Sequence, residues 1–379
     1  MADTSGINIG LIGAGSVVQR VHLPGLRLCA DIRVLAACDS NLDAAQATGA
    51  AVAHSDYREL LSRGDIDAVI VATPNYLHHE VVMAAIAARK HMMCEKPLAM
   101  NAPQATAMLD AARSAGLVHM TAFTYQFTPA VRYARHLIES RAIGEIRTVR
   151  AAYQMALSSH LLGWRSTTKQ AGSGVLGDIG SHLIHLVQWL AGNIVSVSAR
   201  SRKFREDPAS DVEDWIAFLA EFESGACGTF EISRVCPGRG ADIAENMFIE
   251  IYGTTGSLLF SLQEPLVLRV ALGPAAGDPA AMLEARPVPP EFLKVRGAPR
   301  NPAEGDPRWS YRYDQAFWFV SNIRHGQSRS PSFADGLSCQ TVIDAVLDSS
   351  SRGSWVSITA PRSSGGTEPA ALGSALADP

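Results

Sequence analysis

The feature that most constrains the fold is the start of the chain, where a short apolar run ends at a pair of glycines. The segment INIGLIGAGSVVQ indicates a buried strand, a turn at Gly13 and Gly15, and then a helix. Apolar runs at 32–38 and 68–73 have the composition of further buried parallel strands, and helical patterns lie between them. Strands and helices that alternate in this way predict a doubly wound parallel α/β sheet.

The glycine turn suits the pyrophosphate of a dinucleotide. Gly13 permits the tight turn and Gly15 lets the backbone approach the phosphates, which the N-terminus of the following helix attracts. A turn that only joins a strand to a helix is the alternative, because Val18 stands where a third glycine or alanine is usual. Asp39 ends the next strand, where its carboxylate would accept hydrogen bonds from an adenosine ribose or simply cap a helix. Since a carboxylate repels a 2′-phosphate, we expect NAD rather than NADP.

The bulk properties narrow the class of protein. A chain of 379 residues exceeds the usual size of one hydrophobic core and suggests two domains. The formal charge of −4 gives no reason to expect nucleic acid or an anionic membrane as a partner. The first residues lack the pattern of a secretory signal, no apolar run is long enough to span a bilayer, and the six cysteines form no CxxC pair. We therefore expect a cytoplasmic protein without disulfides or a zinc site.

A change of composition after residue 124 divides the chain. We expect a Rossmann dinucleotide-binding domain over 5–124, a substrate-binding and oligomerisation domain of α+β type over 125–360, and a disordered tail over 361–379. Hairpin patterns such as DVEDWIAFLAEFESGACGTFEISRV predict antiparallel strand pairs in the second domain, which suit an open sheet. One face of such a sheet is available for subunit contact, so a homodimer or homotetramer is expected.

The end of the second domain is expected to change from irregular to helical. The proline- and glycine-rich span 271–308 has the composition of a loop or insertion. Two helices, over 311–325 and 334–351, are expected to follow it.

Lys96 follows the fifth apolar strand, in the segment CEKPLAM. Ligands bind at the carboxyl ends of parallel strands, so Glu95 and Lys96 are expected near a bound nicotinamide, with Pro97 stiffening the turn. For an isolated EKP, a surface ion pair would be the simpler interpretation.

The segment GDIGSHLIH brings an acid and two histidines close together. On a helix over 178–190, Asp178, His182, His185 and Trp189 fall on one stripe. Three interpretations are open: a capped helix start with two solvated histidines, a metal site, and a proton-transfer site. No partner cluster of ligands is identifiable elsewhere in the sequence, so no metal is expected.

Several motifs resemble one enzyme family when they are taken in order. GLIGAGSVV, VATPNYLHHEV, HMMCEKPLAM and GSGVLGDIGSHLIHLVQWLAG together resemble the glucose–fructose oxidoreductase/inositol dehydrogenase/MocA family. The resemblance implies a Rossmann domain followed by a large, mainly antiparallel sheet, and oxidation or reduction of a sugar or cyclitol hydroxyl with NAD(H) or NADP(H). It also implies that Lys96, Asp178 and His182 are catalytic. The chain departs from the family at His185, where many members have Asp, and this departure bears on the substrate.

Each catalytic residue has an expected role. Oxidation of a secondary alcohol removes the hydroxyl proton as hydride leaves the same carbon, and a histidine such as His182 suits the base. Asp178 would fix the tautomer of that histidine, and Lys96 would stabilise the developing alkoxide and join the proton relay. The roles of Lys96 and His182 are exchangeable in a coupled relay.

Further residues are expected around the two ligands. The residues expected to hold the cofactor are Gly13, Gly15, Ser16, Val17, Asp39, Thr73, Pro74, Asn75, His78, Glu95 and Lys96. The residues expected to contact the substrate are Lys96, His160, Trp164, Arg165, Asp178, His182 and His185, with Tyr125 and Tyr153 as weaker candidates. For the aromatic and arginine side chains, support of their own loop is an equal alternative.

Three functions fit these residues. The main hypothesis is an NAD-dependent dehydrogenase that acts on a hydroxyl of a sugar, glycoside or cyclitol. A hydrolase or lyase that oxidises a sugar transiently and returns the hydride would use the same residues. A regulatory protein that senses a sugar or NAD is the third, and the intact Lys96, Asp178 and His182 argue against it.

Overall fold

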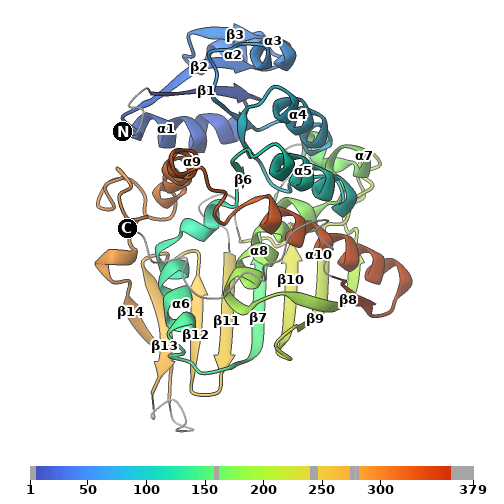
Figure 1. Ribbon diagram of the computed structural model, residues 1–379. Helices are drawn as coiled ribbons and strands as arrows, with labels where there is room; N and C mark the ends of the chain where they lie inside the picture. Colours follow the sequence, from blue (N-terminus) through green and yellow to red (C-terminus); the bar gives the residue numbers. More distant parts are fainter. Residues whose placement is uncertain (1–5, 158–161, 240–245, 274–277, 279–280, 360–379) are drawn as a thin grey trace.

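The chain folds around two β-sheets. The structure is a computed structural model that describes residues 6–157, 162–239, 246–273, 278 and 281–359. Figure 1 shows the N-terminal parallel sheet at the top and the larger C-terminal sheet below it, with helices between them. The predicted combination of a doubly wound parallel domain and a mainly antiparallel open sheet is therefore confirmed.

The N-terminal sheet has six parallel strands in the order β3-β2-β1-β4-β5-β6. This order reverses between β1 and β4, and dinucleotides bind at the crevice that such a reversal creates. The strands are β1 (Ile7–Ile12), β2 (Ile32–Cys38), β3 (Val52–His54), β4 (Ala68–Val71), β5 (His91–Cys94) and β6 (His119–Thr121). The helices are α1 (Leu23–Leu28), which continues a π-helical turn at Val18–His22, α2 (Leu42–Gln46), α3 (Tyr57–Leu61), α4 (Asn75–Ala87) and α5 (Ala102–Ser114).

Local sequence signals account for much of this domain. All four residues of β4, AVIV, are buried, as expected for a parallel strand with helices on both faces. Asn101 caps α5 by accepting a hydrogen bond from the backbone of Gln104 at 3.0 Å. Strand β5 ends at Cys94 and helix α5 begins at Ala102, so Lys96 lies in the segment that connects them.

The C-terminal sheet has nine strands in the order β14-β13-β12-β11-β7-β10-β9-β8-β15. Among the described strands of this sheet, β7 and β10 pair in parallel and all the other pairs are antiparallel. The strands are β7 (Ile146–Gln154), β8 (Ile194–Arg202), β9 (Trp215–Phe222), β10 (Cys227–Ser233), β11 (Asn246–Gly253), β12 (Gly256–Ser261), β13 (Val267–Leu272), β14 (Glu284–Pro287) and β15 (Val356–Ser357).

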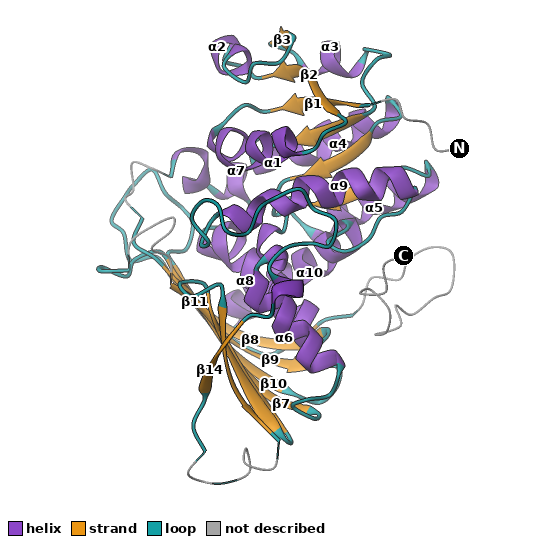
Figure 2. Ribbon diagram, turned by 90° about the vertical axis from the view of Figure 1, so that its left-hand side faces the viewer, coloured by secondary structure: helices purple, strands orange, loops and turns teal. Residues whose placement is uncertain are grey.

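Helices cover one face of this sheet. Figure 2 shows α6, α8 and α10 on the same side of the strands. The helices of this part are α6 (Pro129–Glu139), α7 (Thr168–Ala171), α8 (Ser181–Ala191), α9 (Asp314–His325) and α10 (Phe333–Arg352), and 3-10 turns lie at Thr124–Phe127, Gly163–Ser166, Pro290–Phe292 and Ser310–Tyr313.

The structure refines several expectations for this domain. The helices expected at 311–325 and 334–351 are present as α9 and α10. The expectation of an irregular segment over 271–308 is partly wrong, because residues 284–287 form strand β14 against β13. The tail at 361–379 lies outside the described residues.

The C-terminal segment returns to the N-terminal domain. Helix α9 packs against α1, and the backbone N–H of Thr121 at the end of β6 donates to the carbonyl of Pro331 at 3.0 Å. Asp314, at the start of α9, forms a buried ion pair with Arg300 at 2.8 Å. This packing brings the turn at 310–313 beside the crevice of the parallel sheet.

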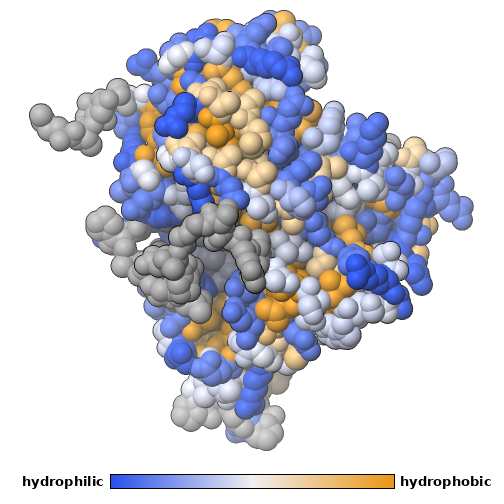
Figure 3. All heavy atoms as spheres, turned by 45° about the vertical axis from the view of Figure 1, so that its right-hand side comes forward, coloured by the Kyte–Doolittle hydropathy of each residue, from blue (hydrophilic) through white to orange (hydrophobic). Residues whose placement is uncertain are grey.

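The described residues include no helix that is both long and apolar enough to cross a membrane. Figure 3 shows hydrophilic residues over much of one face, with hydrophobic residues in separate patches between them.

Candidate active site

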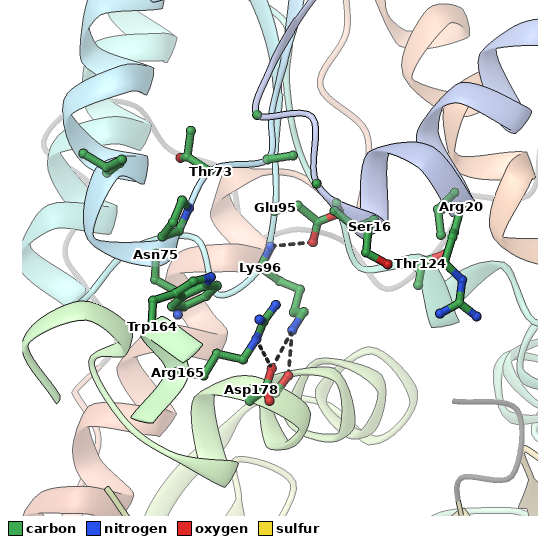
Figure 4. Close-up of a pocket in the computed structure, with 18 of the residues that line it drawn as sticks. Ser16, Arg20, Thr73, Asn75, Glu95, Lys96, Thr124, Trp164, Arg165 and Asp178 are labelled. Carbon is green, nitrogen blue, oxygen red and sulfur yellow. Dashed lines mark hydrogen bonds and ion pairs between the residues drawn. The ribbon is translucent and has the colours of Figure 1, made fainter. Parts of the chain in front are cut away.

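A cavity of about 690 Å³ lies where the strand order of the parallel sheet reverses. Residues that follow four parallel strands line it: Gly13 after β1, Asp39 after β2, Thr73 after β4 and Lys96 after β5. The C-terminal domain closes the other side with Asp178, His182 and several aromatic residues. Figure 4 shows that the labelled side chains come from both domains and point into a common space.

The glycine turn leaves room for a ligand. Gly13 has φ +95°, and a Cβ there would lie 2.4 Å from the carbonyl oxygen of Ala72, so no other residue fits without a shift. A Cβ on Gly15 would meet no atom within 4 Å, although Gly15 lines the cavity. Ser16 and Val17 line the same space at the start of the helix that follows. A helix N-terminus beside an open glycine backbone fits a pyrophosphate.

Asp39 links the turn to the next strand. Its Oδ2 accepts a hydrogen bond from the backbone of Ala14 at 2.8 Å, and its Oδ1 accepts one from Asn41 at 2.9 Å. Helix α2 is capped by the Asn41 side chain, so Asp39 is not the cap itself. A carboxylate has about four acceptor sites, and Asp39 lines the cavity, so it can still accept hydrogen bonds from a ribose.

The loop after β4 forms another wall. Thr73, Pro74 and Asn75, which the sequence predicts as cofactor contacts, line the cavity. The expectation for His78 is wrong, because its fully buried ring lies behind the loop, 2.9 Å from the carbonyl oxygens of Thr73 and Pro97. His78 therefore holds two ligand-binding loops together rather than lining the cavity.

Lys96 and Asp178 meet across the two domains. The Lys96 ammonium donates to the main-chain carbonyl of Asp178 at 2.6 Å and lies 3.7 Å from its carboxylate. Arg165 Nε donates to the same carboxylate at 3.3 Å, and its guanidinium lies 4.3 Å from the centre of the Trp164 ring. Burial alone would raise the pKa of Asp178, but the charges of Lys96 and Arg165 outweigh it and lower the pKa. Asp178 is therefore ionised.

His182 lines the same cavity from the first turn of α8. Its Nδ1 is buried and has no hydrogen-bond partner among the described residues, and its ring lies 4.5 Å from that of Tyr125. Burial, and then the charges of Lys96 and Arg312, lower the pKa of His182 well below its usual value. The imidazole is therefore neutral near pH 7 and is able to accept a proton.

The predicted pairing of Asp178 with His182 is wrong. Asp178 lies in a π-helical turn, Leu176–Gly180, and α8 starts only at Ser181. The wider turn removes Asp178 from the regular helical stripe, because positions four apart no longer superpose. The Asp178 carboxylate consequently contacts Lys96 and Arg165.

His185 is not at the cavity. It is 3% exposed, donates a hydrogen bond from Nε2 to Gln126 Oε1 at 2.9 Å, and stacks on Phe123 with ring centres 4.0 Å apart. Burial lowers the pKa of His185 to about 4. The expectation of a substrate contact is therefore wrong, because this part of α8 packs against the turn at Thr124–Phe127. His160 lies outside the described residues.

Sequence reasoning missed the contribution of the C-terminal segment. Trp309, Arg312 and Gln315 line the cavity although they lie more than one hundred residues after α8, and Arg20 and Thr124 also line it. Arg312 Nη2 donates to the Tyr125 hydroxyl at 3.1 Å, and the hydroxyls of Tyr125 and Tyr153 are 2.8 Å apart. The arginine- and aromatic-rich segment RWSYRY is the only signal in this stretch, and it does not reveal where the segment packs.

The described residues contain no group of three His, Cys, Asp or Glu side chains placed to hold a metal ion. The open glycine turn, the Asp39 carboxylate, and a lysine and a histidine in one cavity are typical of a nicotinamide-dinucleotide oxidoreductase.

Comparison with known proteins gives the family. An oxidoreductase family domain with an NAD-binding Rossmann fold matches residues 7–123, and the GFO/IDH/MocA C-terminal domain matches residues 131–259. Levoglucosan dehydrogenase of Pseudarthrobacter phenanthrenivorans is 34% identical over 392 residues, which cover 93% of this chain and 98% of that protein. The chain belongs to the glucose–fructose oxidoreductase/inositol dehydrogenase/MocA family, as the motifs predict, and it is an NAD-dependent oxidoreductase.

Two further matches are also to enzymes that oxidise or reduce sugars. The 1,5-anhydro-D-fructose reductase of Ensifer adhaerens is 33% identical over 257 residues, which cover 66% of this chain and 74% of that protein. A solved structure of levoglucosan dehydrogenase in complex with NADH and levoglucosan has a TM-score of 0.85 at 33% identity, and the match covers 93% of this chain and 99% of that one.

The positive charge of Arg312 is one of the causes that lower the pKa of His182. Replacing Arg312 by Gln is expected to raise the pKa of His182, because a positive neighbour that opposes protonation is removed. Since the base must be neutral, the acid limb of kcat/KM should then move to higher pH. NMR titration of the histidine ring signals measures the pKa. Arg312→Lys is the control that keeps the charge. If His182 has the same pKa in Arg312→Gln as in Arg312→Lys, the charge of Arg312 does not lower that pKa.

Proposed function

We propose that the protein oxidises a secondary hydroxyl of a sugar, glycoside or cyclitol and transfers the hydride to NAD. The observation that carries this proposal is the Lys96 ammonium, fixed by Asp178 in a cavity that His182 and the glycine turn also line. The similarity to levoglucosan dehydrogenase and to its complex with NADH and levoglucosan supports a compact sugar as the substrate.

Lys96 and His182 have different roles in the removal of the hydroxyl proton. NAD, held by Gly13, Gly15 and Asp39, would supply the acceptor for the hydride of the carbinol carbon, and the hydroxyl of the substrate would then have to lose its proton. His182 accepts that proton, because it lines the cavity and its depressed pKa keeps the ring neutral. Lys96 stabilises the negative charge that develops on the same oxygen, and Asp178 holds the ammonium in place.

The remaining walls suit a sugar ring. Tyr125, Tyr153, Trp164 and Trp309 provide flat apolar surfaces, which can pack on the C–H faces of a pyranose. The hydroxyls of the two tyrosines and the Arg165 guanidinium provide hydrogen bonds at the edges of these surfaces. A few polar groups on a largely apolar wall are the usual means of orienting such a ligand.

The function is tested with a screen of inositols, free sugars, anhydrosugars and glycosides for reduction of NAD. Lys96→Met should keep NAD binding and lower kcat/KM on the best substrate by about 10³-fold, because charge stabilisation at the reacting oxygen is lost. Lys169→Met, at an exposed position, should leave turnover unchanged.

Turnover by Lys96→Met near the wild-type rate would contradict the mechanism. Conversion of a glycoside without net NADH would instead support transient oxidation by a hydrolase or lyase. Ligand binding without turnover on any substrate would support a sensing protein.

We further propose that the uncovered face of the nine-stranded sheet joins subunits in a homodimer or homotetramer. Leu219 and Tyr252 on this sheet are 49% and 40% exposed. The alternation in β9 buries Ile216, Phe218, Ala220 and Phe222 under the helices and turns Leu219 to the opposite face. An antiparallel sheet with apolar groups on its open face is suited to subunit contact.

Light scattering after size-exclusion chromatography tests this contact. The wild-type protein should have the mass of a dimer or tetramer, and Leu219→Arg should reduce it. Leu42→Arg, at an exposed position of α2, is the matched control and should leave the mass unchanged. A monomeric wild-type protein would contradict the proposal.

A further inference from the structure

The Glu95 carboxylate occupies a fixed position in the cavity beside Lys96. Its side chain is 12% exposed and lines the cavity. Glu95 Oε1 lies 2.8 Å from His22 Nε2, and Oε2 accepts a hydrogen bond from the backbone N–H of Lys96 at 3.2 Å. Figure 4 draws this second contact between the labelled Glu95 and Lys96. Both oxygens are therefore held, and the carboxylate cannot turn away from the site.

The groups behind Glu95 leave its negative charge in place. His22 is fully buried, and its Nδ1 lies 3.5 Å from the amide nitrogen Nε2 of Gln315. An amide nitrogen only donates, so Nδ1 accepts, and Nε2 carries the hydrogen that points to Glu95. A neutral imidazole satisfies this pattern. Burial alone would raise the pKa of Glu95, but the hydrogen bond from His22, the charge of that ring when it is protonated, and the charge of Lys96 outweigh burial and lower the pKa.

Cations dominate the rest of this end of the cavity. Lys96, Arg165 and Arg312 line it together, and the Asp178 carboxylate is shared between the first two. The two redox states of nicotinamide differ in charge, because the oxidised ring is positive and the reduced ring is neutral. Repulsion by the cations therefore acts on the oxidised ring, and an adjacent anion opposes it.

We propose that Glu95 is a specificity-determining residue for the redox state of the cofactor, favouring the binding of oxidised over reduced nicotinamide. The role follows from a fixed carboxylate next to Lys96, which follows β5, whereas Asp39 follows β2, and β1 and β4 lie between these two strands. It rests on the proposed function in one respect, the place of the nicotinamide beside Lys96. His22 and Gln315 act as positioning residues for this carboxylate.

The test measures the dissociation constants of NAD⁺ and NADH by calorimetry at pH 8, without any sugar. In Glu95→Gln the ratio of the constant for NAD⁺ to that for NADH should rise about 5-fold, because only the charged ring loses an attraction. In Glu95→Asp, which keeps the charge, the ratio should stay within about 2-fold of the wild-type value.

Asp39→Asn is the matched control after a different strand of the parallel sheet. It removes the carboxylate that is expected to bind the adenosine ribose, so it should weaken both cofactor forms by the same factor and leave the ratio unchanged. If Glu95→Gln does not fold, Glu95→Ala gives the same reading, because it also removes the charge.

An unchanged ratio in whichever neutral variant folds would overturn the proposal, as would an equal change of the ratio in Asp39→Asn. Since no sugar is present, these outcomes are independent of the substrate screen. If none of the screened sugars leads to reduction of NAD, the proposed function fails, but the ratio of dissociation constants can still change in Glu95→Gln. If a sugar is oxidised and the ratio does not change, only the proposal for Glu95 fails.

Discussion

The contact between the Lys96 ammonium and Asp178 joins the two domains at the place where chemistry occurs. Lys96 follows strand β5 of the parallel sheet, and Asp178 lies in a turn that contacts β10 of the antiparallel sheet. Neither domain alone completes the cluster, because the lysine would lose its acceptors and the carboxylate would lose a counter-charge. The remaining walls of the cavity are arranged around this contact.

Burial sets the electrostatic properties of the site. His182 is neutral because it is buried beside two cations, and Asp178 is ionised because those charges outweigh its own burial. A neutral imidazole next to a fixed ammonium is the arrangement that removal of a proton from an alcohol requires. Glu95 adds a second anion to this set, next to Lys96.

The sequence predicts the parts of the molecule that depend on local patterns. The glycine turn, Asp39 and the strand-end position of Lys96 follow from apolar runs and short motifs, and all of them line the cavity. The π-helical turn at Leu176–Gly180 was not predictable, because composition does not distinguish it from the start of an α-helix. The error at His185 has a related cause, since a helical stripe shows which residues share a face but not what that face contacts. Arg312 and Trp309 depend on long-range packing of α9 against α1, for which the sequence has no local signal.

A double-mutant cycle on kcat/KM tests the central claim most directly, with Lys96→Met, Asp178→Asn and the combination of both. If Asp178 acts by holding Lys96, the Asp178 substitution should cost about 30-fold or more in the wild-type background and less than about 3-fold once Lys96 is Met. If the double substitution lowers kcat/KM by the product of the two single factors, the two residues act separately. The account of a shared lysine–aspartate site would then be wrong.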